Sequence, residues 1–412
     1  MKVTPATFRN ARRRAPAIGA VVALAMMTGC GGDSSDSSVA AGEGGDGGGA
    51  VTLKVGAMFD QSGPFASLGR EQRQGFEMAL EELNAQGDVK LEATIEDSQT
   101  QPDKAVEIAR QFLTKDVDVI FGPTSAAACQ AVQQVTERAG VATYCYSGGP
   151  IEFTDHVFSG EYGPVEGLAN IPLAFMRDQG WKRIACLKTA DASGEAYSAP
   201  LKEQAPKYGL EVVAEETFQP GATDVVSQLT KIRAANPDVI YACASGANLV
   251  PVTRGVVQLG MEQPVFAGLG SVLLEVVDAV KSYVPKGGLY SNGSWVMLPD
   301  SVPDDYPGKD LVQSFVSDFE AKAGKKPSIL AGDTVDSVRL MAEAIKRADA
   351  AGEVSGTTIA AELEKITEFP GIISTYNFAP DRHRGTTAPP VIAEWTKDGT
   401  VKLAATLDST EP

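Results

Sequence analysis

The stretch "VTLKVGAMFDQSGPFASLGREQRQGFEMALEELNAQG", residues 51–87, carries the pattern that decides the fold. Residues 51–59 are rich in β-branched and other apolar side chains and lead into a Gly/Pro turn, which predicts a buried strand. Apolar side chains from Phe76 to Leu83 then recur at helical spacing, and Gly87 ends the predicted helix. A strand followed by a helix of this length is typical of a βαβ unit.

The same alternation of strand and helix continues along the chain. Further strands are predicted at 91–97, 117–122, 141–146, 182–189, 211–218, 238–243 and 265–268, with helices between them and a hairpin at 389–405. The roughly 360 residues from Val51 onward are too many for one hydrophobic core, which indicates two lobes. The sequence therefore predicts an α/β fold with two doubly wound parallel-sheet lobes.

The first 29 residues have the layout of a secretory signal. Five basic residues precede an apolar stretch at 15–27 that is too short to span a bilayer as a helix. "MTGC" at 27–30 resembles a bacterial lipobox, which would put a diacylglycerol on Cys30; an ordinary signal peptide with an incidental cysteine is the alternative. Residues 30–50 have the composition of a flexible linker. We therefore expect a bacterial protein that is exported and lipid-anchored to the outer face of the cytoplasmic membrane.

Composition argues against several classes of function. Removing the five basic residues of the signal from the chain's 36 leaves 31 against 53 acidic residues, a net charge of −22, which disfavours nucleic acid as a partner. The only histidines are His156 and His383, and no two cysteines have CxxC spacing, so zinc sites and Ser–His triads are disfavoured. GxSxG, GxxxxGK[ST] and HExxH motifs are absent from the sequence. We predict no catalytic residue, no cofactor and no metal site.

Four cysteines remain after Cys30. Cys129 falls in the first turns of the helix after the strand at 117–122, and Cys145 ends the next strand. A helix that runs back over a βαβ unit brings these two positions together, so we predict a Cys129–Cys145 disulfide closing a loop of 17 residues. Cys186 and Cys243 fall on neighbouring predicted strands, where they either form a second disulfide or stay as buried thiols.

The candidate ligand site lies at the loops after the strands. In doubly wound sheets, small ligands bind outside the carboxyl ends of the strands, where helix N-termini point. These loops are rich in Ser, Thr and Gly, which suit a polar or anionic molecule, although helix capping alone would explain any one of them. Candidate binding residues in the first half are Phe65, Ser125, Ala126, Ala127, Tyr146, Ser147, Gly148, Gly149 and Tyr162, and in the second half Ser193, Asn248 and Ser271. Phe65, Tyr146, Tyr162 and Trp295 would form an apolar wall unless they are part of the core.

These loops resemble those of type I periplasmic binding proteins of the leucine/isoleucine/valine-binding family, the receptors of ABC importers. The matching stretches are residues 55–87, "VDVIFGPTSAAA" (117–128), "IACLKTADASGEAYS" (184–198) and "AGDTVDSVRLMAEAIKRA" (331–348), and the resemblance covers about 51–404. It implies two lobes joined by three crossovers near Gly163, Ser291 and Pro380, with a ligand cleft between them. Lobe 1 would comprise 51–163 and 292–380, and lobe 2 would comprise 164–291 and 381–412.

The resemblance implies a monomeric receptor for a branched-chain amino acid or a related small carboxylate or amide, serving a permease of the branched-chain amino acid type. Family members pair the ligand's α-ammonium with an acidic residue, and that position aligns here on Asn248. Asp191, Glu275 or Asp333 would have to substitute, so a ligand without an α-ammonium is a second class to consider. A sensory ligand-binding module of the same fold, without transport, is the alternative function; a hydrolase is disfavoured.

Overall fold

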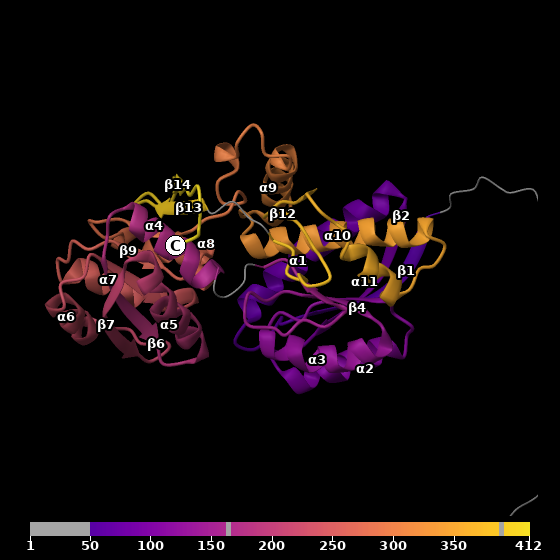
Figure 1. Cartoon of the computed structure of the whole chain (residues 1–412), viewed down its shortest axis with the longest axis horizontal. Coiled ribbons are helices and arrows are strands. Elements are labelled where there is room, and N and C mark those ends of the chain that lie inside the picture. Colours follow the sequence, from indigo (N-terminus) through magenta and orange to yellow (C-terminus); the bar gives the residue numbers. More distant parts are fainter. Residues whose placement is uncertain (1–49, 162–165, 387–390) are drawn as a thin grey trace, which may run out of the picture. The chain divides into compact units, whose positions relative to one another are not determined.

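The computed structural model describes residues 50–161, 166–386 and 391–412 (Figure 1). Residues 49–412 form one compact unit. The predicted signal, Cys30 and the linker lie outside the described residues, as does Tyr162. Among the helices that are described, none combines the length and apolar character that a membrane span requires.

A five-stranded parallel sheet is built from the first part of the chain, in the order β2-β1-β3-β4-β5. Its strands are β1 (Val51–Phe59), β2 (Val89–Asp97), β3 (Val119–Phe121), β4 (Ala142–Cys145) and β5 (Val157–Ser159). Side chains alternate between the two faces of a strand. On β1, Val55 and Phe59 therefore enter one core while Met58 enters the other.

Helices cover both faces of this sheet (Figure 1). The helices α1 (Ala66–Gln86), α10 (Ile329–Ala350) and α11 (Gly356–Leu363) pack on one face, and α2 (Pro102–Leu113) and α3 (Ala126–Ala139) on the other. The helix α9 (Lys309–Ala323) and the two-stranded ladder of β11 (Phe369–Pro370) with β12 (Thr375–Tyr376) join the α1/α10 side. The first-sheet core thus draws on chain segments far apart in the sequence.

The second sheet has seven strands in the order β14-β13-β10-β9-β8-β6-β7. Its strands are β6 (Arg183–Thr189), β7 (Glu211–Phe218), β8 (Val239–Cys243), β9 (Val265–Ala267), β10 (Leu289–Asn292), β13 (Val391–Trp395) and β14 (Val401–Thr406). The first five are parallel, whereas β13 and β14 are antiparallel to their neighbours. Its helices are α4 (Ile171–Asp178) and α5 (Ala192–Gln204) on one face, and α6 (Val226–Ala234), α7 (Leu249–Gln258) and α8 (Leu274–Val280) on the other.

The prediction of an α/β fold with parallel sheets is confirmed. The chain leaves the first sheet after β5, leaves the second after β10, and returns to the second with β13. The third crossover is predicted near Pro380, and a parallel bridge between Ser159 and Arg384 places Arg384 beside the first sheet. The lobe boundaries themselves stay a prediction.

Both cysteine pairs are joined by disulfides. Cys129 in α3 is bonded to Cys145 at the end of β4, with the Cα atoms 6.0 Å apart. Cys186 on β6 is bonded to Cys243 on the adjacent β8, with the Cα atoms 6.1 Å apart. The first bond is the predicted pair, and for the second pair the structure has the disulfide in place of free thiols.

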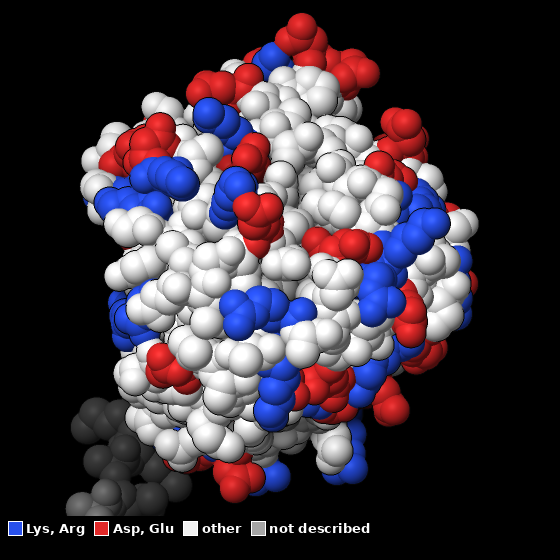
Figure 2. Space-filling view, turned by 90° about the vertical axis from the view of Figure 1, so that its left-hand side faces the viewer, with Lys and Arg blue, Asp and Glu red and all other residues white. Residues whose placement is uncertain are grey.

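Charged side chains of both signs are interspersed on the face shown in Figure 2. The described residues include surface ion pairs such as Lys202–Glu215 and Lys231–Glu216, each with 2.9 Å between nitrogen and oxygen. Exposed pairs of this kind contribute little to stability, about 0–1 kcal/mol each. The mixture of signs on this face makes a poor electrostatic footprint for a polyanion.

Candidate functional site

One buried carboxylate joins three strand-end loops of the first sheet. Asp60 follows β1 and is fully buried. Its Oδ1 accepts hydrogen bonds from Ser98 Oγ at 2.6 Å and from the Thr100 N–H at 2.8 Å, both after β2. Its own N–H donates to Thr124 Oγ1 at 3.1 Å, after β3. The loops after β1, β2 and β3 therefore have a fixed relative position.

Phe65 lies on the first of these loops with an exposed ring. Its side chain is 39% exposed, which is unusual for a large apolar group, and its N–H donates to Thr100 Oγ1 at 3.2 Å. Of the four side chains considered for an apolar wall, Phe65 is thus accessible to a ligand. A single exposed aromatic is common on protein surfaces and does not by itself identify a site.

The loops after β3 and β4 lie against each other. Ser125 caps α3, with its Oγ accepting from the Ala128 N–H at 3.3 Å, while Ala126 is half-buried and Ala127 is exposed. A Cβ added to Gly149 would lie 2.9 Å from the Ala126 Cβ, so only glycine permits this approach. The structure thus brings the predicted residues of these two loops together at the N-terminus of a 14-residue helix.

Tyr146 and Trp295 are core residues. The Tyr146 hydroxyl lies 2.7 Å from Ser337 Oγ of α10, and its ring stacks on Phe59 with centroids 5.8 Å apart. Trp295 is 2% exposed and belongs to the same core. Tyr146 follows β4 two residues after the buried Tyr144, so strand alternation directs both rings towards α10. The core interpretation left open by the sequence therefore applies to both side chains.

Ser147, Gly148 and Gly149 remain half-buried at the sheet edge. The carbonyl oxygens of Ser147 and Gly149 accept hydrogen bonds from the Arg384 guanidinium at 3.1 and 3.0 Å. The Glu161 carboxyl lies nearby: its burial raises its pKa, and the opposite charge of Arg384 counteracts that rise. Sequence reasoning missed Arg384, because nothing near position 384 signals a contact with position 147.

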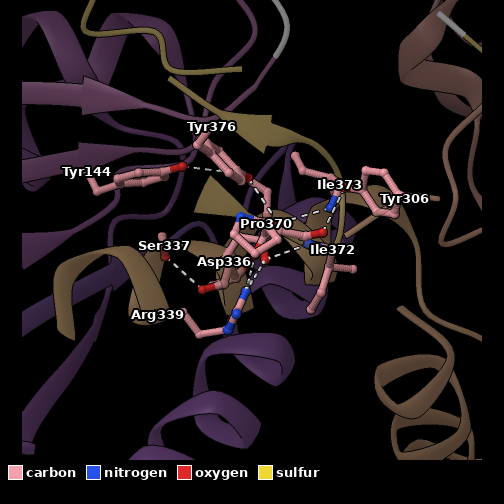
Figure 3. Close-up of polar contacts among 12 residues, drawn as sticks. Tyr144, Tyr306, Asp336, Ser337, Arg339, Pro370, Ile372, Ile373 and Tyr376 are labelled. Atoms are coloured by element: carbon pink, nitrogen blue, oxygen red, sulfur yellow. Dashed lines mark hydrogen bonds and ion pairs between the residues drawn. The ribbon is translucent and has the colours of Figure 1, made fainter. Parts of the chain in front are cut away.

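Asp336 is the centre of a buried network on α10 (Figure 3). Its carboxylate accepts from the Ile372 N–H at 2.7 Å, the Ile373 N–H at 3.0 Å and the Tyr376 hydroxyl at 3.1 Å. Arg339, one turn further along α10, approaches it at 3.4 Å. Burial raises the pKa of Asp336, while Arg339 and the hydrogen bonds oppose that rise. The network fastens residues 370–376 to α10.

Asp333 lies one turn before Asp336 and is 1% exposed. Its Oδ1 accepts from the Tyr144 hydroxyl at 3.1 Å, and its Oδ2 has no hydrogen-bond partner among the described residues. Burial raises the pKa of Asp333 well above its usual value, and the neighbouring Glu161 carboxyl adds to the rise. The side chain is therefore stabilised in its neutral form, which is a poor partner for an ammonium group.

At the edge of the second sheet, Asp191 is the N-cap of α5. Its Oδ1 accepts from the Gly194 N–H at 2.9 Å, from Ser193 Oγ at 2.8 Å and from Thr189 Oγ1 at 2.8 Å. Burial acts to raise the pKa of Asp191, but these hydrogen bonds outweigh it and the pKa is lowered. The hydroxyl of Ser193, a predicted ligand residue, thus donates its hydrogen bond to the Asp191 carboxylate.

Asn248 and Ser271 hold backbone segments of the second sheet's loops. Asn248 Oδ1 accepts from the Gly221 N–H at 2.9 Å, and its Nδ2 donates to the Ser245 carbonyl at 3.0 Å. Ser271 is fully buried and donates from Oγ to the Ala244 carbonyl at 3.1 Å. Both predicted residues therefore have structural partners in neighbouring loops at this edge of the second sheet.

Tyr197 of α5, which sequence reasoning missed, links these loops. Its hydroxyl accepts from the Gly270 N–H at 2.7 Å and lies 3.5 Å from Ser245 Oγ. The predicted site residues thus form two groups, one at the carboxyl edge of each sheet. Within the described ranges, no group of three or more His, Cys, Asp or Glu side chains is arranged to hold a metal ion.

Comparison with known proteins agrees with this architecture. The sequence profile of the family described as "Periplasmic binding protein" matches residues 52–400. The chain is 25% identical over 326 residues to the leucine-, isoleucine-, valine-, threonine- and alanine-binding protein of Pseudomonas aeruginosa, covering 77% of this chain and 83% of that protein. It is 26% identical over 295 residues to Leu/Ile/Val-binding protein homolog 7 of Brucella abortus, covering 68% of this chain and 72% of that protein.

Solved structures share the fold. An extracellular ligand-binding receptor from Rhodopseudomonas palustris superposes with a TM-score of 0.75 at 21% identity, covering 86% of this chain and 100% of that one. The branched-chain amino acid transporter substrate-binding protein of Streptococcus pneumoniae, solved with isoleucine, superposes with a TM-score of 0.69 at 22% identity. The match covers 86% of this chain and 98% of that one. The chain belongs to the periplasmic binding protein family and has the fold of these solved receptors.

Proposed function

We propose that this protein is the extracytoplasmic solute-binding component of an ABC importer, and that it binds a small carboxylate or amide without catalysing a reaction. The observation that carries the proposal is the meeting of the loops after β3 and β4, with Gly149 against Ala126 at the N-terminus of α3, where Ala127 is exposed. Amides at a helix N-terminus, together with the positive end of the helix dipole, favour a carboxylate. The Phe65 ring would provide apolar contact beside it.

The chemistry of the acidic side chains favours a ligand without an α-ammonium. The Asp191 carboxylate already accepts the N-cap hydrogen bonds of α5, and the Glu161 carboxyl already interacts with the positive charge of Arg384. Burial favours the neutral form of Asp333, and both polar atoms of Asn248 bond to backbone. An ammonium group that is desolvated without an anion costs several kcal/mol. We therefore expect a 2-oxo or other ammonium-free carboxylate to bind more tightly than the corresponding amino acid.

Titration calorimetry on the full-length chain tests this expectation with L-leucine and its oxo analogue, 4-methyl-2-oxopentanoate. The oxo acid should bind with the lower Kd, and a bulky residue in place of Gly149, as in Gly149→Val, should abolish that binding by separating the two loops. Gly221→Val is not a suitable control. An added Cβ there would meet nothing within 4 Å, but the φ of +76° strains any residue other than glycine. Ala235→Val at the C-cap of α6, away from the loops, is the control for side-chain bulk.

Tight leucine binding that is lost in Asp333→Asn would refute the ammonium-free proposal while leaving the transport receptor intact. If neither compound binds, we expect other small carboxylates and amides to be found by thermal shift. A chain that binds none of them would contradict the receptor function itself.

We also propose that Cys30 is the lipidated N-terminus of the exported protein and that residues 30–50 tether the folded body above the membrane, next to a permease of the branched-chain amino acid type. The proposal rests on the small residues before Cys30 and on the coil-forming composition after it. Cys30→Ser should leave an unprocessed or unlipidated form. Unchanged mass and membrane association in that variant would contradict the anchor.

A further inference from the structure

The guanidinium of Arg384 lies where two parts of the first sheet's edge meet. Its Nη1 donates to the Ser147 carbonyl at 3.1 Å and to the Glu161 carbonyl at 2.7 Å, and its Nη2 donates to the Gly149 carbonyl at 3.0 Å. Ser159 Oγ lies 3.5 Å from Nη1. One side chain therefore holds both the loop after β4 and the end of β5, where the chain leaves the first sheet.

The backbone that carries Arg384 is itself fixed to β5. The Ser159 N–H donates to the His383 carbonyl at 3.0 Å, and the Gly385 N–H donates to the Ser159 carbonyl at 3.1 Å. The His383 ring is buried and stacks on Phe158 with centroids 4.4 Å apart. Residues 383–385 thus lie along β5 as an added strand segment.

The side chain is also positioned by packing. The Arg384 guanidinium carbon lies 5.2 Å from the centroid of the Phe153 ring, within the range of a cation–π contact. The planar guanidinium carries five N–H donors in a rigid fork, so it can serve several carbonyls that lie in different directions. A lysine ammonium at this position would reach fewer of them.

We propose that Arg384 is a positioning residue that couples the ligand loop at 147–149 to the end of β5 at 159–161, the last described residues before the predicted first crossover. A ligand seated on this loop would shift the Ser147 and Gly149 carbonyls, and the shared guanidinium would transmit that shift to the Glu161 carbonyl. The ligand's part in this coupling rests on the proposed function. The link between the loop and the end of β5 does not, because it exists in the protein without a ligand.

Hydrogen–deuterium exchange on the full-length protein tests the link directly. In Arg384→Gln, the amides of 146–149 and of 157–161 should both exchange about tenfold faster than in the wild type, because both segments lose their shared donor. Arg384→Lys keeps the charge, and its amide exchange rates should lie between those of the wild type and of Arg384→Gln. Arg382→Gln removes an exposed arginine two residues away and is the matched control, with exchange expected to stay at the wild-type rate.

A second arm adds saturating L-leucine or 4-methyl-2-oxopentanoate, whichever binds the wild type. In the wild type the probe should protect both segments, whereas in Arg384→Gln it should protect 146–149 alone. Protection of both segments in that variant would overturn the coupling. So would unchanged exchange without ligand, or an equal rise in the amides of β6 and β8, which would indicate general destabilisation. If neither probe binds, a small carboxylate or amide found by thermal shift takes its place in this arm, while the ligand-free arm still decides the role of Arg384.

Discussion

At the edge of the first sheet, the loops are held by ionisable side chains whose partners are far away in the sequence: buried Asp60 reaches Thr100, buried Asp336 reaches Ile372 and half-buried Arg384 reaches Ser147. At the edge of the second sheet, the links are mostly neutral, and they include the Tyr197 hydroxyl that accepts from the Gly270 N–H. There Asn248 reaches Gly221 and Ser245, and Ser271 reaches Ala244. The two edges share a fold pattern, yet they are stabilised by different chemistry.

The difference affects how each edge responds to change. A buried carboxylate that loses a partner is left with an uncompensated charge, which costs several kcal/mol, whereas a lost neutral hydrogen bond costs about 1 kcal/mol. We therefore expect the first edge to be rigid and sensitive to protonation. The second edge should tolerate single substitutions better.

The largest expected effect on the free energy of unfolding comes from removing the disulfides, one of which belongs to each sheet. Each bond restricts the unfolded chain. On the loop-closure description, Cys186–Cys243, with a sequence separation of 57, contributes about 4 kcal/mol, and Cys129–Cys145, with a separation of 16, about 3 kcal/mol. Replacing each pair by serine should lower the free energy of unfolding in that order, as measured by urea titration. A reversed order would mean that strain or residual structure outweighs loop entropy. Thiol titration of the unreduced, unfolded wild type provides the control and should find both pairs oxidised.

Next in size is the loss of the carboxylate that fastens residues 370–376 to α10. Asp336→Asn replaces one of the two oxygens that accept from the Ile372 and Ile373 N–H groups by a donating NH₂, and should lower the free energy of unfolding by about 3 kcal/mol. Asn248→Ala at the second edge removes two neutral hydrogen bonds and should cost about 1 kcal/mol. Equal losses in urea unfolding would remove the distinction between the edges.

The smallest effect is a pH dependence at Asp333. The pKa of this side chain is raised by burial in the folded state, so its contribution to stability is complete below the unfolded pKa of about 3.9 and is lost as the pH rises through the folded pKa. Asn keeps an acceptor for the Tyr144 hydroxyl and does not titrate. The urea midpoint of Asp333→Asn relative to the wild type should therefore increase from pH 4 to pH 8. Asp305→Asn, at an exposed position, is the control, and a difference independent of pH would contradict the assignment.

Local sequence pattern predicted most of the elements that place the site. The β-branched run at 51–59 is β1, and the predicted strand at 211–218 is β7. The strand β5 was not predicted, because its three residues lie between Asp155-His156 and Gly160-Glu161, without the longer apolar run that marks the equally short β3.

The side-chain partners of the site were predictable only in part. Gly149 and Ala126 belong to loops that a parallel sheet must bring to one edge, so their proximity follows from the order of strands and helices. The contact of Arg384 with Ser147 spans 237 residues and depends on the return of the chain past β5. Likewise, Tyr146 could be read from sequence as ligand wall or core, and the position of Ser337 on α10 decides between them.

The pairing of β13 with β10 bears on how the polypeptide is made. Ser291 on β10 is opposite Ala393, and Trp395 donates from Nε1 to Ser291 Oγ at 2.8 Å, so residues 391–406 complete the second sheet. These residues are synthesised after β10, and until they pair with it β10 presents a bare strand edge to its surroundings. Open edges of this kind template intermolecular aggregation. Holdase chaperones that keep the nascent chain unpaired would protect it at this stage. A chain truncated before residue 391 would keep the open edge of β10 and would be exposed to aggregation and proteolysis.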